Sequence, residues 1–451
     1  MFKQMIHKLW PGVGRPAGLQ ATLLASAMIP MLFLMACGGS SSSDSSAAPS
    51  ITTQPSPVTV RSTQTATFTI SVEGNPGPSI AWQKDGQNIP GANTATLILH
   101  SVSLSDAGSY RAVIQNSLGT VTSNAATLTV LPTVLFNAPA AMAVDVSGNI
   151  YVANSGDHTI CKVDGNGGLA ILAGASGQPG YLDGTGANAR FNWPTGLALD
   201  GAGTLYVADG SNVIRTISPG GVVTTLAGAA GTAGTADGTG STARFGALLQ
   251  GLTWDGGGNL LVADTYNHTI RRITTAGVVT TVAGLPGQPG ATNGAVAVAT
   301  FSNPSGVAVN ASGTIFVADY GNSTVRAISG GMVTTFAGVS GTKGSTDGVP
   351  TTATFNRPTG LSLDSQGRLF VADADANTIR RLETNGTVST FAGTADAQGN
   401  YDATGADARF HRPTNLFMLA GDTLLVADTA NGQIRKATSA GVVTTLVDTA
   451  P

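Results

Sequence analysis

Aspartate and arginine recur at a fixed spacing along the C-terminal two thirds of this 451-residue sequence, and both residue types can do chemistry. Each aspartate ends an apolar run, and an arginine follows six or seven positions later. The pairs are Asp209 and Arg215, Asp264 and Arg271, Asp319 and Arg326, Asp373 and Arg380, and Asp428 and Arg435. A ring of aspartates could bind a metal ion or act in catalysis, whereas aspartate paired with arginine forms charge-assisted hydrogen bonds.

A further copy of the pattern favours the second interpretation. It has Asn154 in place of the aspartate and Cys161 in place of the arginine, so both partners change together. Catalysis breaks the symmetry of a repeat, and this pattern preserves it. We therefore predict that the aspartate and arginine of each copy pair across a turn between two strands and have a structural role.

The elements that carry these pairs are themselves repeated. A phenylalanine begins each copy, and the intervals between copies are 55, 54, 56, 54 and 55 residues. The phenylalanines are Phe136, Phe191, Phe245, Phe301, Phe355 and Phe410. Each copy contains four short strand-like runs, which in the second copy are residues 196–200, 204–209, 213–217 and 222–228. Since one such sheet cannot bury both faces alone, the repeat predicts a six-bladed β-propeller.

The repeat also carries a recognisable motif, P-x-G-[LV]-[AS]-[LV]-[DN] followed by G-x-[LI]-[YF]-V-A-D and then I-R. This motif resembles NHL repeats, and the resemblance implies a six-bladed propeller of a kind that commonly mediates protein contacts. Between copies, an aspartate stands nine residues after the glycine of an AG pair, with Asn293 replacing it once. The constant length predicts ordered loops that pack on the blades.

The segments that begin the innermost strands contain few groups for catalysis. They contain one histidine, His411, and no carboxylate, and Glu383 is the single glutamate of the propeller sequence. His158 and His268 occupy equivalent turns, where we expect surface residues. We predict no catalytic residue, no metal site and no cofactor. The alternative is a lyase or hydrolase with its site at the central channel, as in some six-bladed propellers, which would need inward-facing carboxylates.

Asymmetry among the copies indicates where a ligand would bind. Strand direction predicts that the turns between second and third strands and the loops between blades share one face, here called the loop face. Aromatic residues and arginines around a concavity suit a protein or glycan ligand. The candidate ligand-binding residues on this face are Trp193, Asn303, Arg357, His411, Arg412, Tyr266 and Tyr320.

The N-terminus has the pattern of a targeting segment. Lys3, Lys8 and Arg15 precede an apolar run at residues 21–36, which ends in LMAC at residues 34–37. This resembles the lipobox of bacterial lipoprotein signal peptides, which implies acylation of Cys37, and Gly38 after it implies sorting to the outer membrane. Residues 38–50 are rich in serine and glycine and predict a flexible tether. The alternative is a transmembrane anchor.

Charge and cysteine content exclude several classes of function. Loss of the three basic residues of the signal peptide would change the formal charge from -3 to -6, so nucleic acid is not an expected partner. If Cys37 carries lipid, Cys161 is the one remaining thiol, and an internal disulfide cannot form. For Cys161 an intermolecular disulfide is one interpretation, and a simple replacement of the arginine is the other.

Residues 51–130 predict a separate β-sandwich, because alternating strands are separated by turn residues at short intervals. The segment DAGSY at residues 106–110 resembles the D-x-G-x-Y corner of immunoglobulin-like domains, and Trp82 stands where that family has its core tryptophan. Ile70 and Ala112 occupy the positions of the family's two cysteines, so apolar packing must close this core.

Together these patterns predict an all-β chain with four parts: residues 1–36 as signal peptide, 37–50 as tether, 51–130 as an immunoglobulin-like domain and 131–451 as an NHL-type propeller. We expect a lipoprotein of the bacterial outer membrane, attached through its lipid only, on the periplasmic or the external side. The predicted function is a non-catalytic binding or adhesion platform for an envelope or extracellular protein or glycan. The sequence does not predict an oligomeric state.

Overall fold

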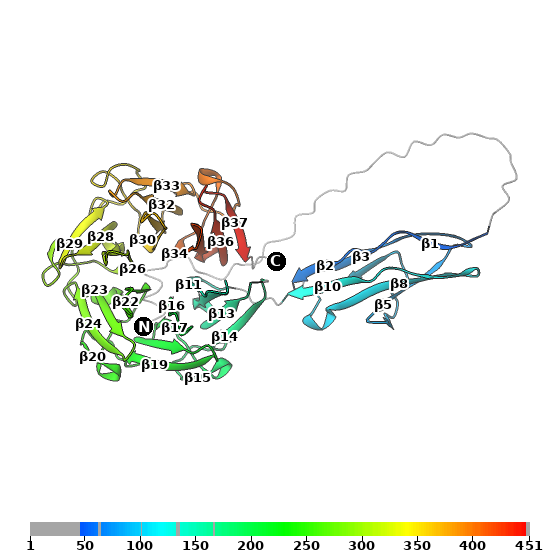
Figure 1. Cartoon of the computed structure of the whole chain (residues 1–451), viewed down its shortest axis with the longest axis horizontal. Coiled ribbons are helices and arrows are strands. Elements are labelled where there is room, and N and C mark those ends of the chain that lie inside the picture. Colours follow the sequence, from blue (N-terminus) through cyan, green and yellow to red (C-terminus); the bar gives the residue numbers. More distant parts are fainter. Residues whose placement is uncertain (1–45, 62–64, 101, 132–135, 166, 448–451) are drawn as a thin grey trace. The chain divides into compact units, whose positions relative to one another are not determined.

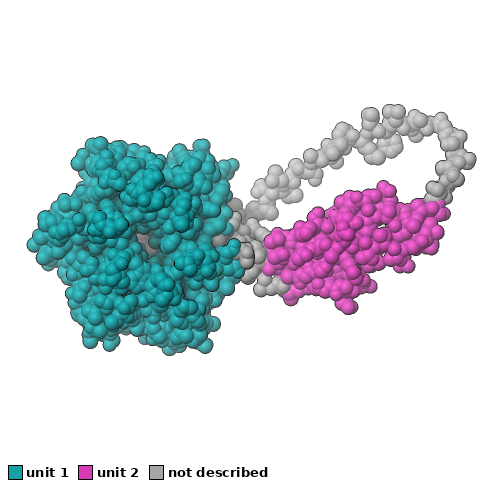
Figure 2. Space-filling view, in the orientation of Figure 1, with its two compact units in different colours: residues 1–12, 134–450 teal, residues 13–133, 451 magenta. Residues whose placement is uncertain are grey.

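The computed structural model describes residues 46–61, 65–100, 102–131, 136–165 and 167–447. Contacts divide the chain into two compact units between residues 133 and 134, shown in different colours in Figure 2. The predicted signal peptide, Cys37 and most of the tether lie outside the described residues. The tether was predicted to reach residue 50, but residues 47–50 belong to strand β1 (Ala47–Thr53), and the boundary predicted after residue 130 falls within strand β10 (Ala126–Leu131). Within the described residues, no helix is long and apolar enough to cross a membrane.

The N-terminal unit is a sandwich of short strands (Figure 1). Its elements are β1 (Ala47–Thr53), β2 (Val58–Arg61), β3 (Ala66–Thr69), β4 (Ser71–Asn75), β5 (Ser79–Lys84), β6 (Gln87–Asn88), β7 (Thr96–Leu99), a 3-10 turn (Leu104–Asp106), β8 (Gly108–Asn116), β9 (Gly119–Thr122) and β10 (Ala126–Leu131). One sheet has the order β2-β10-β8-β5-β6, with β9 also paired to β8. The β1-β4 and β3-β7 pairs form the other sheets.

An aromatic and aliphatic cluster fills the core of this sandwich. Trp82 is fully buried, and its indole Nε1 donates a hydrogen bond to the Thr94 carbonyl at 2.9 Å. The Tyr110 hydroxyl donates to the Asp106 carbonyl at 2.7 Å, which ties the corner to strand β8. Ile70 and Ala112 are both buried, so apolar side chains fill the positions where the resembling family has cysteines.

The C-terminal unit contains six antiparallel sheets of four consecutive strands each, arranged around a central axis (Figure 1). Blades 1 to 3 are β11 (Pro139–Val144), β12 (Ile150–Asn154), β13 (Thr159–Val163) and β14 (Leu169–Ala173); β16 (Pro194–Leu199), β17 (Leu205–Asp209), β18 (Val213–Ile217) and β19 (Val222–Gly228); and β21 (Leu252–Trp254), β22 (Asn259–Asp264), β23 (Thr269–Thr274) and β24 (Val278–Ala283). Blades 4 to 6 are β26 (Pro304–Val309), β27 (Ile315–Asp319), β28 (Thr324–Ser329) and β29 (Met332–Ala337); β30 (Pro358–Leu363), β31 (Leu369–Asp373), β32 (Thr378–Leu382) and β33 (Val388–Ala392); and β34 (Pro413–Leu419), β35 (Thr423–Asp428), β36 (Gln433–Ala437) and β37 (Val443–Val447).

The loops between blades form additional elements that the sequence did not predict. Short strands β15 (Gly184–Thr185), β20 (Gly238–Thr239) and β25 (Gly294–Ala295) pair with the outermost strands β19, β24 and β29 of the blades that follow. Further 3-10 turns in these loops are Gly186–Asn188, Gly240–Thr242 and Gly405–Asp407. Each strand of this kind therefore covers an edge that would otherwise expose unpaired backbone groups.

Apolar clusters fill the spaces between neighbouring blades. The cluster between blades 4 and 5 contains Phe355, whose ring is fully buried with side chains of both sheets. Among the described residues, no strand is shared between blades 6 and 1. There the Thr429 hydroxyl donates to the Pro139 carbonyl at 2.7 Å, and Asn415 Oδ1 accepts from the Met142 N–H at 3.2 Å. The predicted fold class, a sandwich followed by a six-bladed propeller, is confirmed.

Candidate functional site

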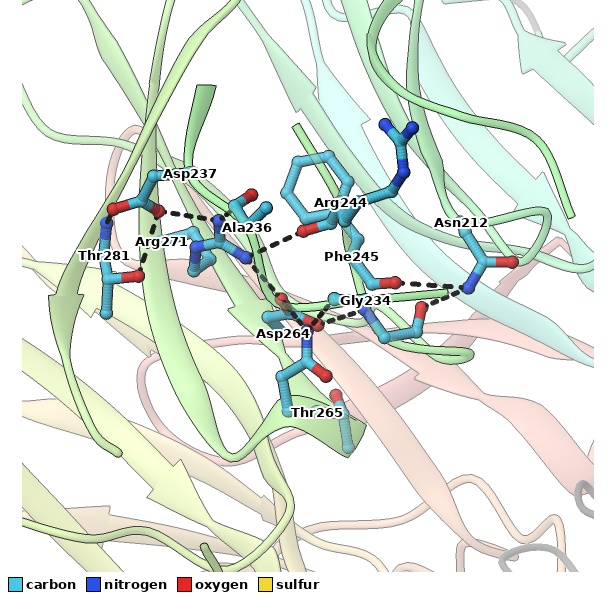
Figure 3. Close-up of polar contacts among 12 residues, drawn as sticks. Asn212, Gly234, Ala236, Asp237, Arg244, Phe245, Asp264, Thr265, Arg271 and Thr281 are labelled. Atoms are coloured by element: carbon cyan, nitrogen blue, oxygen red, sulfur yellow. Dashed lines mark hydrogen bonds and ion pairs between the residues drawn. The ribbon is translucent and has the colours of Figure 1, made fainter. Parts of the chain in front are cut away.

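The repeated arginine lies at the centre of a buried network, which Figure 3 shows for blade 3. Arg271 is 1% exposed. Its Nη1 donates to Asp264 Oδ2 at 2.8 Å, and its Nη2 donates to Asp237 Oδ1 of the preceding loop at 2.8 Å. The guanidinium carbon lies 5.3 Å from the centre of the Phe245 ring. Arg271 thus connects the end of a strand, the loop between blades and the phenylalanine of the repeat.

The same arrangement recurs in the other four blades that have the pair. The distances from arginine to strand-end aspartate are 3.1 Å for Arg215 and Asp209, 2.8 Å for Arg326 and Asp319, 3.1 Å for Arg380 and Asp373, and 2.9 Å for Arg435 and Asp428. The loop partners are Asp183, Asn293, Asp347 and Asp402. Each loop partner also forms a hydrogen bond with a threonine of the outermost strand. The aspartates accept from the threonine hydroxyl, and Asn293 donates to Thr335. The arginine therefore holds each loop against its blade.

Burial acts against the charge of these strand-end carboxylates. Because they are removed from water, the pKa of Asp209, Asp319 and Asp428 is raised to about 6 and that of Asp373 to about 7, with the arginine and backbone N–H groups opposing the rise. Such a pair is costly to break, since one partner alone would be a buried uncompensated charge. This arrangement is suited to fixing loops and occupies the lone pairs that a metal ion would need.

The position of blade 1 in the chain explains why it lacks the aspartate and arginine pair. No loop from an earlier blade precedes it, so an arginine at this position would have no loop carboxylate to bind. Cys161 is fully buried there, among apolar side chains of blades 1 and 6. An intermolecular disulfide through Cys161 is therefore incompatible with this position, and the replacement interpretation is the one that the burial supports.

We expect the Cys161 thiol to resist alkylation in the folded chain. Burial raises its pKa to about 11, so almost no reactive thiolate forms near neutral pH. Iodoacetamide treatment at about pH 8, followed by peptide mapping, should label Cys161 only after denaturation. Rapid labelling of the native chain would show that the seam between blades 1 and 6 opens readily.

The turns between second and third strands join neighbouring blades. Their 3-10 segments are Ser155–Asp157, Thr265–Asn267, Tyr320–Asn322 and Thr429–Asn431. His158 Nδ1 accepts from the Trp193 N–H at 3.1 Å, and His268 Nδ1 accepts from the Asn303 N–H at 3.0 Å. The expectation that these histidines are surface residues is wrong for His158, which is 8% exposed, because each ring reaches the next blade.

Four of the candidate residues predicted on the loop face share an unusual backbone conformation. Trp193, Asn303, Arg357 and Arg412 all have positive φ, between 51° and 63°. Ala138 has the same conformation in blade 1, so it belongs to the repeat and not to one site. In blade 3 the corresponding segment, residues 245–251, is one residue longer and shows no such conformation.

Four side chains from blades 4, 5 and 6 meet on the loop face, and we call them the Arg357 cluster: Tyr320, Arg357, Asp375 and Arg412. Arg357 Nη1 lies 3.0 Å from Asp375 Oδ2, and Arg412 Nη2 lies 3.4 Å from Asp375 Oδ1. The Arg357 guanidinium lies over the Tyr320 ring at 5.3 Å. The side chains of Arg357, Asp375 and Arg412 are 27%, 21% and 13% exposed, so solvent reaches all three.

Three further candidates are Tyr266, His411 and Trp193, which are not members of the Arg357 cluster. Burial raises the pKa of Tyr266, with a further rise from Tyr320 nearby. Burial also lowers the pKa of His411, with Arg412 adding to the effect, and the His411 backbone N–H donates to Asp428. The Trp193 ring of blade 2 contacts the His158 ring of blade 1 edge-on, with ring centres 5.6 Å apart. Asp375 was not predicted from the sequence, where its one signal is that it is a second carboxylate two residues after Asp373.

A cavity of about 310 Å³ occupies the central channel. First strands of all six blades line it, with Leu197, Trp254, Leu363 and Phe417 among its walls. The described wall consists of apolar residues, glycines, serine, threonine and asparagine, and it has no ionisable side chain. Among the described residues, no three His, Cys, Asp or Glu side chains lie close enough together to hold a metal ion.

Fold and site define the chain as an immunoglobulin-like domain joined to an NHL-type propeller. Residues 49–130 match the immunoglobulin I-set domain, and residues 301–328 and 355–382 match the NHL repeat. NHL repeat-containing protein 2 from Bos taurus is 29% identical over 335 residues, which cover 66% of this chain and 46% of that protein. Leucine-rich repeats and immunoglobulin-like domains protein 1 from Homo sapiens is 39% identical over 95 residues, 19% of this chain and 9% of that protein. The chain spans less than half the length of these curated relatives.

Solved structures share the fold at low sequence identity. A structural genomics protein of unknown function from Bacteroides thetaiotaomicron has a TM-score of 0.53 and 15% identity, covering 89% of this chain and 99% of that chain. An auxiliary nutrient binding protein from Bacteroides ovatus has a TM-score of 0.50 and 13% identity, covering 90% and 99%. These likenesses show the fold.

Proposed function

We propose that this chain is a cell-envelope lipoprotein whose propeller is a non-catalytic binding platform, with a protein or glycan bound on the loop face. The observation that carries the proposal is the Arg357 cluster. It departs from a repeat that is otherwise closely kept, and its two guanidinium groups stay partly exposed although they share one carboxylate. Departures from symmetry of this kind supply specificity on a repeated scaffold.

The chemistry of the cluster suits recognition. Arginine and tyrosine are the residue types that most often carry binding energy at interfaces, and here Tyr320 holds the Arg357 guanidinium in place. Two guanidinium groups and one carboxylate leave a net positive charge, which favours a ligand with acceptor groups such as carboxylates or carbonyls. A binding role also agrees with the printed name of the Bacteroides ovatus protein of similar fold.

The remaining parts of the proposal rest on the sequence. Acylation at Cys37, the signal peptide at residues 1–36 and a tether between Cys37 and strand β1 are proposed from the patterns described above. Outer-membrane sorting follows from Gly38 in the same way. The alternative of a lyase or hydrolase at the channel is not favoured by any observed contact, because the described channel wall has no side chain that could act as acid or base.

A binding screen of the full-length chain tests this function. Envelope proteins and a glycan array would be screened, and each ligand found would be measured again with the variant Arg357→Ala/Arg412→Ala. We expect at least one of these ligands to lose about 2 kcal/mol or more of binding free energy. Arg381→Ala is the matched control, because this arginine lies on the third strand of blade 5, away from the cluster, and pairs with Glu383.

Two results would overturn the proposal. If no protein or glycan found in the screen binds the double variant more weakly than the unchanged chain, the loop-face site is ruled out. Stoichiometric metal in the purified chain, together with no macromolecular ligand, would favour the enzyme alternative instead.

A further inference from the structure

A groove of about 430 Å³ lies on the face opposite the loop face, between blades 2 and 3. This face carries the tight turns between first and second strands. The groove is lined by Leu199, Asp200, Gly201, Trp254 and Thr275, together with glycines of the blade 3 turn. It is independent of the Arg357 cluster, since it uses other blades and the other face.

Trp254 is the first asymmetric feature of this groove. The corresponding residues of the other blades are Val144, Leu199, Val309, Leu363 and Met418, which are all aliphatic. The Trp254 ring is held edge-on by Tyr206, with ring centres 4.9 Å apart and planes at 87°. Its Nε1 is buried while the residue as a whole is partly exposed, so the exposed part of the ring consists of carbon.

Asp200 is the second asymmetric feature. Its Oδ1 accepts from the backbone N–H groups of Ala202 and Thr204 at 2.9 and 2.8 Å, as in the equivalent turns. Its Oδ2 accepts only a 3.3 Å hydrogen bond from the Tyr206 hydroxyl among the described contacts. A carboxylate oxygen has two lone pairs, so Oδ2 keeps capacity to accept from a ligand.

The equivalent aspartates use that second oxygen within the fold. Oδ2 of Asp145 accepts from Asn149 at 2.7 Å, that of Asp255 from Asn259 at 2.9 Å, and that of Asp364 from Arg368 at 2.6 Å. Blade 2 has Thr204 at this position, and its side chain does not supply such a donor. Asp200, the carboxylate that lacks this donor, therefore lies in the same groove as Trp254.

The glycine next to Asp200 keeps the groove open. A Cβ atom added at Gly201 would meet no atom within 4 Å, so the position faces open space. Blade 1 has Val146 at the equivalent position, fully exposed, which shows that this turn accepts a larger side chain.

We propose that this groove binds a pyranose ring of a neutral oligosaccharide. The C–H face of the sugar packs on the exposed carbon surface of Trp254, and one of its hydroxyl groups donates to the remaining lone pair of Asp200 Oδ2. The negative charge of Asp200 disfavours uronic or sialic acids at this position. The glycan would bind here whatever the ligand of the loop face.

Calorimetric titration of the full-length chain with cellohexaose, chitohexaose and mannohexaose tests this site. We expect at least one of these neutral probes to bind with a Kd of about 1 mM, typical of a single shallow contact. Trp254→Leu, which installs the residue of blades 2 and 5, should weaken binding at least about tenfold. Gly201→Val, which installs the residue of blade 1, should do the same by filling the groove.

The controls separate this groove from the loop face and from loss of fold. Ala311→Val changes the equivalent turn of blade 4 and should leave sugar binding unchanged. Gly201→Val alters no buried side chain, so it remains informative if Trp254→Leu unfolds. The proposal is overturned if none of the probes binds, or if binding survives Gly201→Val. It is also overturned if Arg357→Ala/Arg412→Ala, and not Gly201→Val, removes the sugar.

Discussion

Replacing Arg380 by alanine should lower the free energy of unfolding of the propeller by about 3–5 kcal/mol. The side chain is fully buried, and its removal would leave Asp373 buried without its counter-charge. The loop residue Asp347 would lose its 2.6 Å partner, and the Phe355 ring would lose the guanidinium that lies over it. Denaturant-induced unfolding followed by circular dichroism would measure the loss.

Two further variants show whether the uncompensated carboxylate is the cause. Arg381→Ala, in the next position of the strand, removes a partly exposed arginine and should cost less than about 1 kcal/mol. Asp373→Asn/Arg380→Cys reproduces the Asn154 and Cys161 pair of blade 1 and should be more stable than Arg380→Cys alone. If the double variant is no more stable, the loss comes from the loop and ring contacts and not from the carboxylate.

The pH dependence gives an independent check on the same variant. Burial raises the pKa of Asp373 to about 7 in the folded chain, above its ordinary unfolded value. The folded state therefore binds the proton more tightly, and stability falls as pH rises toward the folded pKa and then levels off. Without Arg380 the pKa of Asp373 in the folded chain rises further, so the variant continues to lose stability above about pH 7. The difference in free energy of unfolding between the unchanged chain and the variant should therefore be larger at about pH 9 than at about pH 6. A deficit that does not change with pH would contradict this account.

Regular features of the propeller could be predicted from the sequence because they repeat. The phenylalanine intervals specified six blades, and the joint change at Asn154 and Cys161 indicated that aspartate and arginine act together. The constant position of Asp183 and its equivalents was visible too, but spacing alone does not say what a residue contacts. The structure supplies the answer, since Arg215 bonds Asp183 and Asp209 with two different nitrogens.

Contacts between blades could not be predicted from the sequence. Asp375 pairs with Arg357 of its own blade and with Arg412 of the next blade, and both arginines have positive φ. A left-handed conformation at arginine is not announced by residue type, as it would be at glycine. His158 was assigned to the surface for a similar reason, since its partner Trp193 lies 35 residues away in the next blade.

Replacing Gly306 by alanine should destabilise the propeller by about 3 kcal/mol, at the upper end of the usual cost of overpacking. The first strands of neighbouring blades approach each other closely around the channel, and a Cβ atom at Gly306 would lie 2.1 Å from the Thr359 carbonyl oxygen. The obstacle is backbone of the next blade, so rotation of a side chain cannot relieve it. Gly196 faces the Gln250 carbonyl in the same way, at 2.0 Å. Denaturant-induced unfolding of the full-length chain measures the effect.

Gly165→Ala is the matched control, because an added Cβ there would meet no atom within 4 Å. It should leave the unfolding transition unchanged or slightly raise it by restricting the unfolded chain. Blades 1 and 6 carry Ala141 and Asn415 where the other blades have glycine, so two of the six blades accept a side chain at this position. If Gly306→Ala proves as harmless as Gly165→Ala, the first strands of blades 4 and 5 must be able to separate, and the channel they line would be adjustable in width.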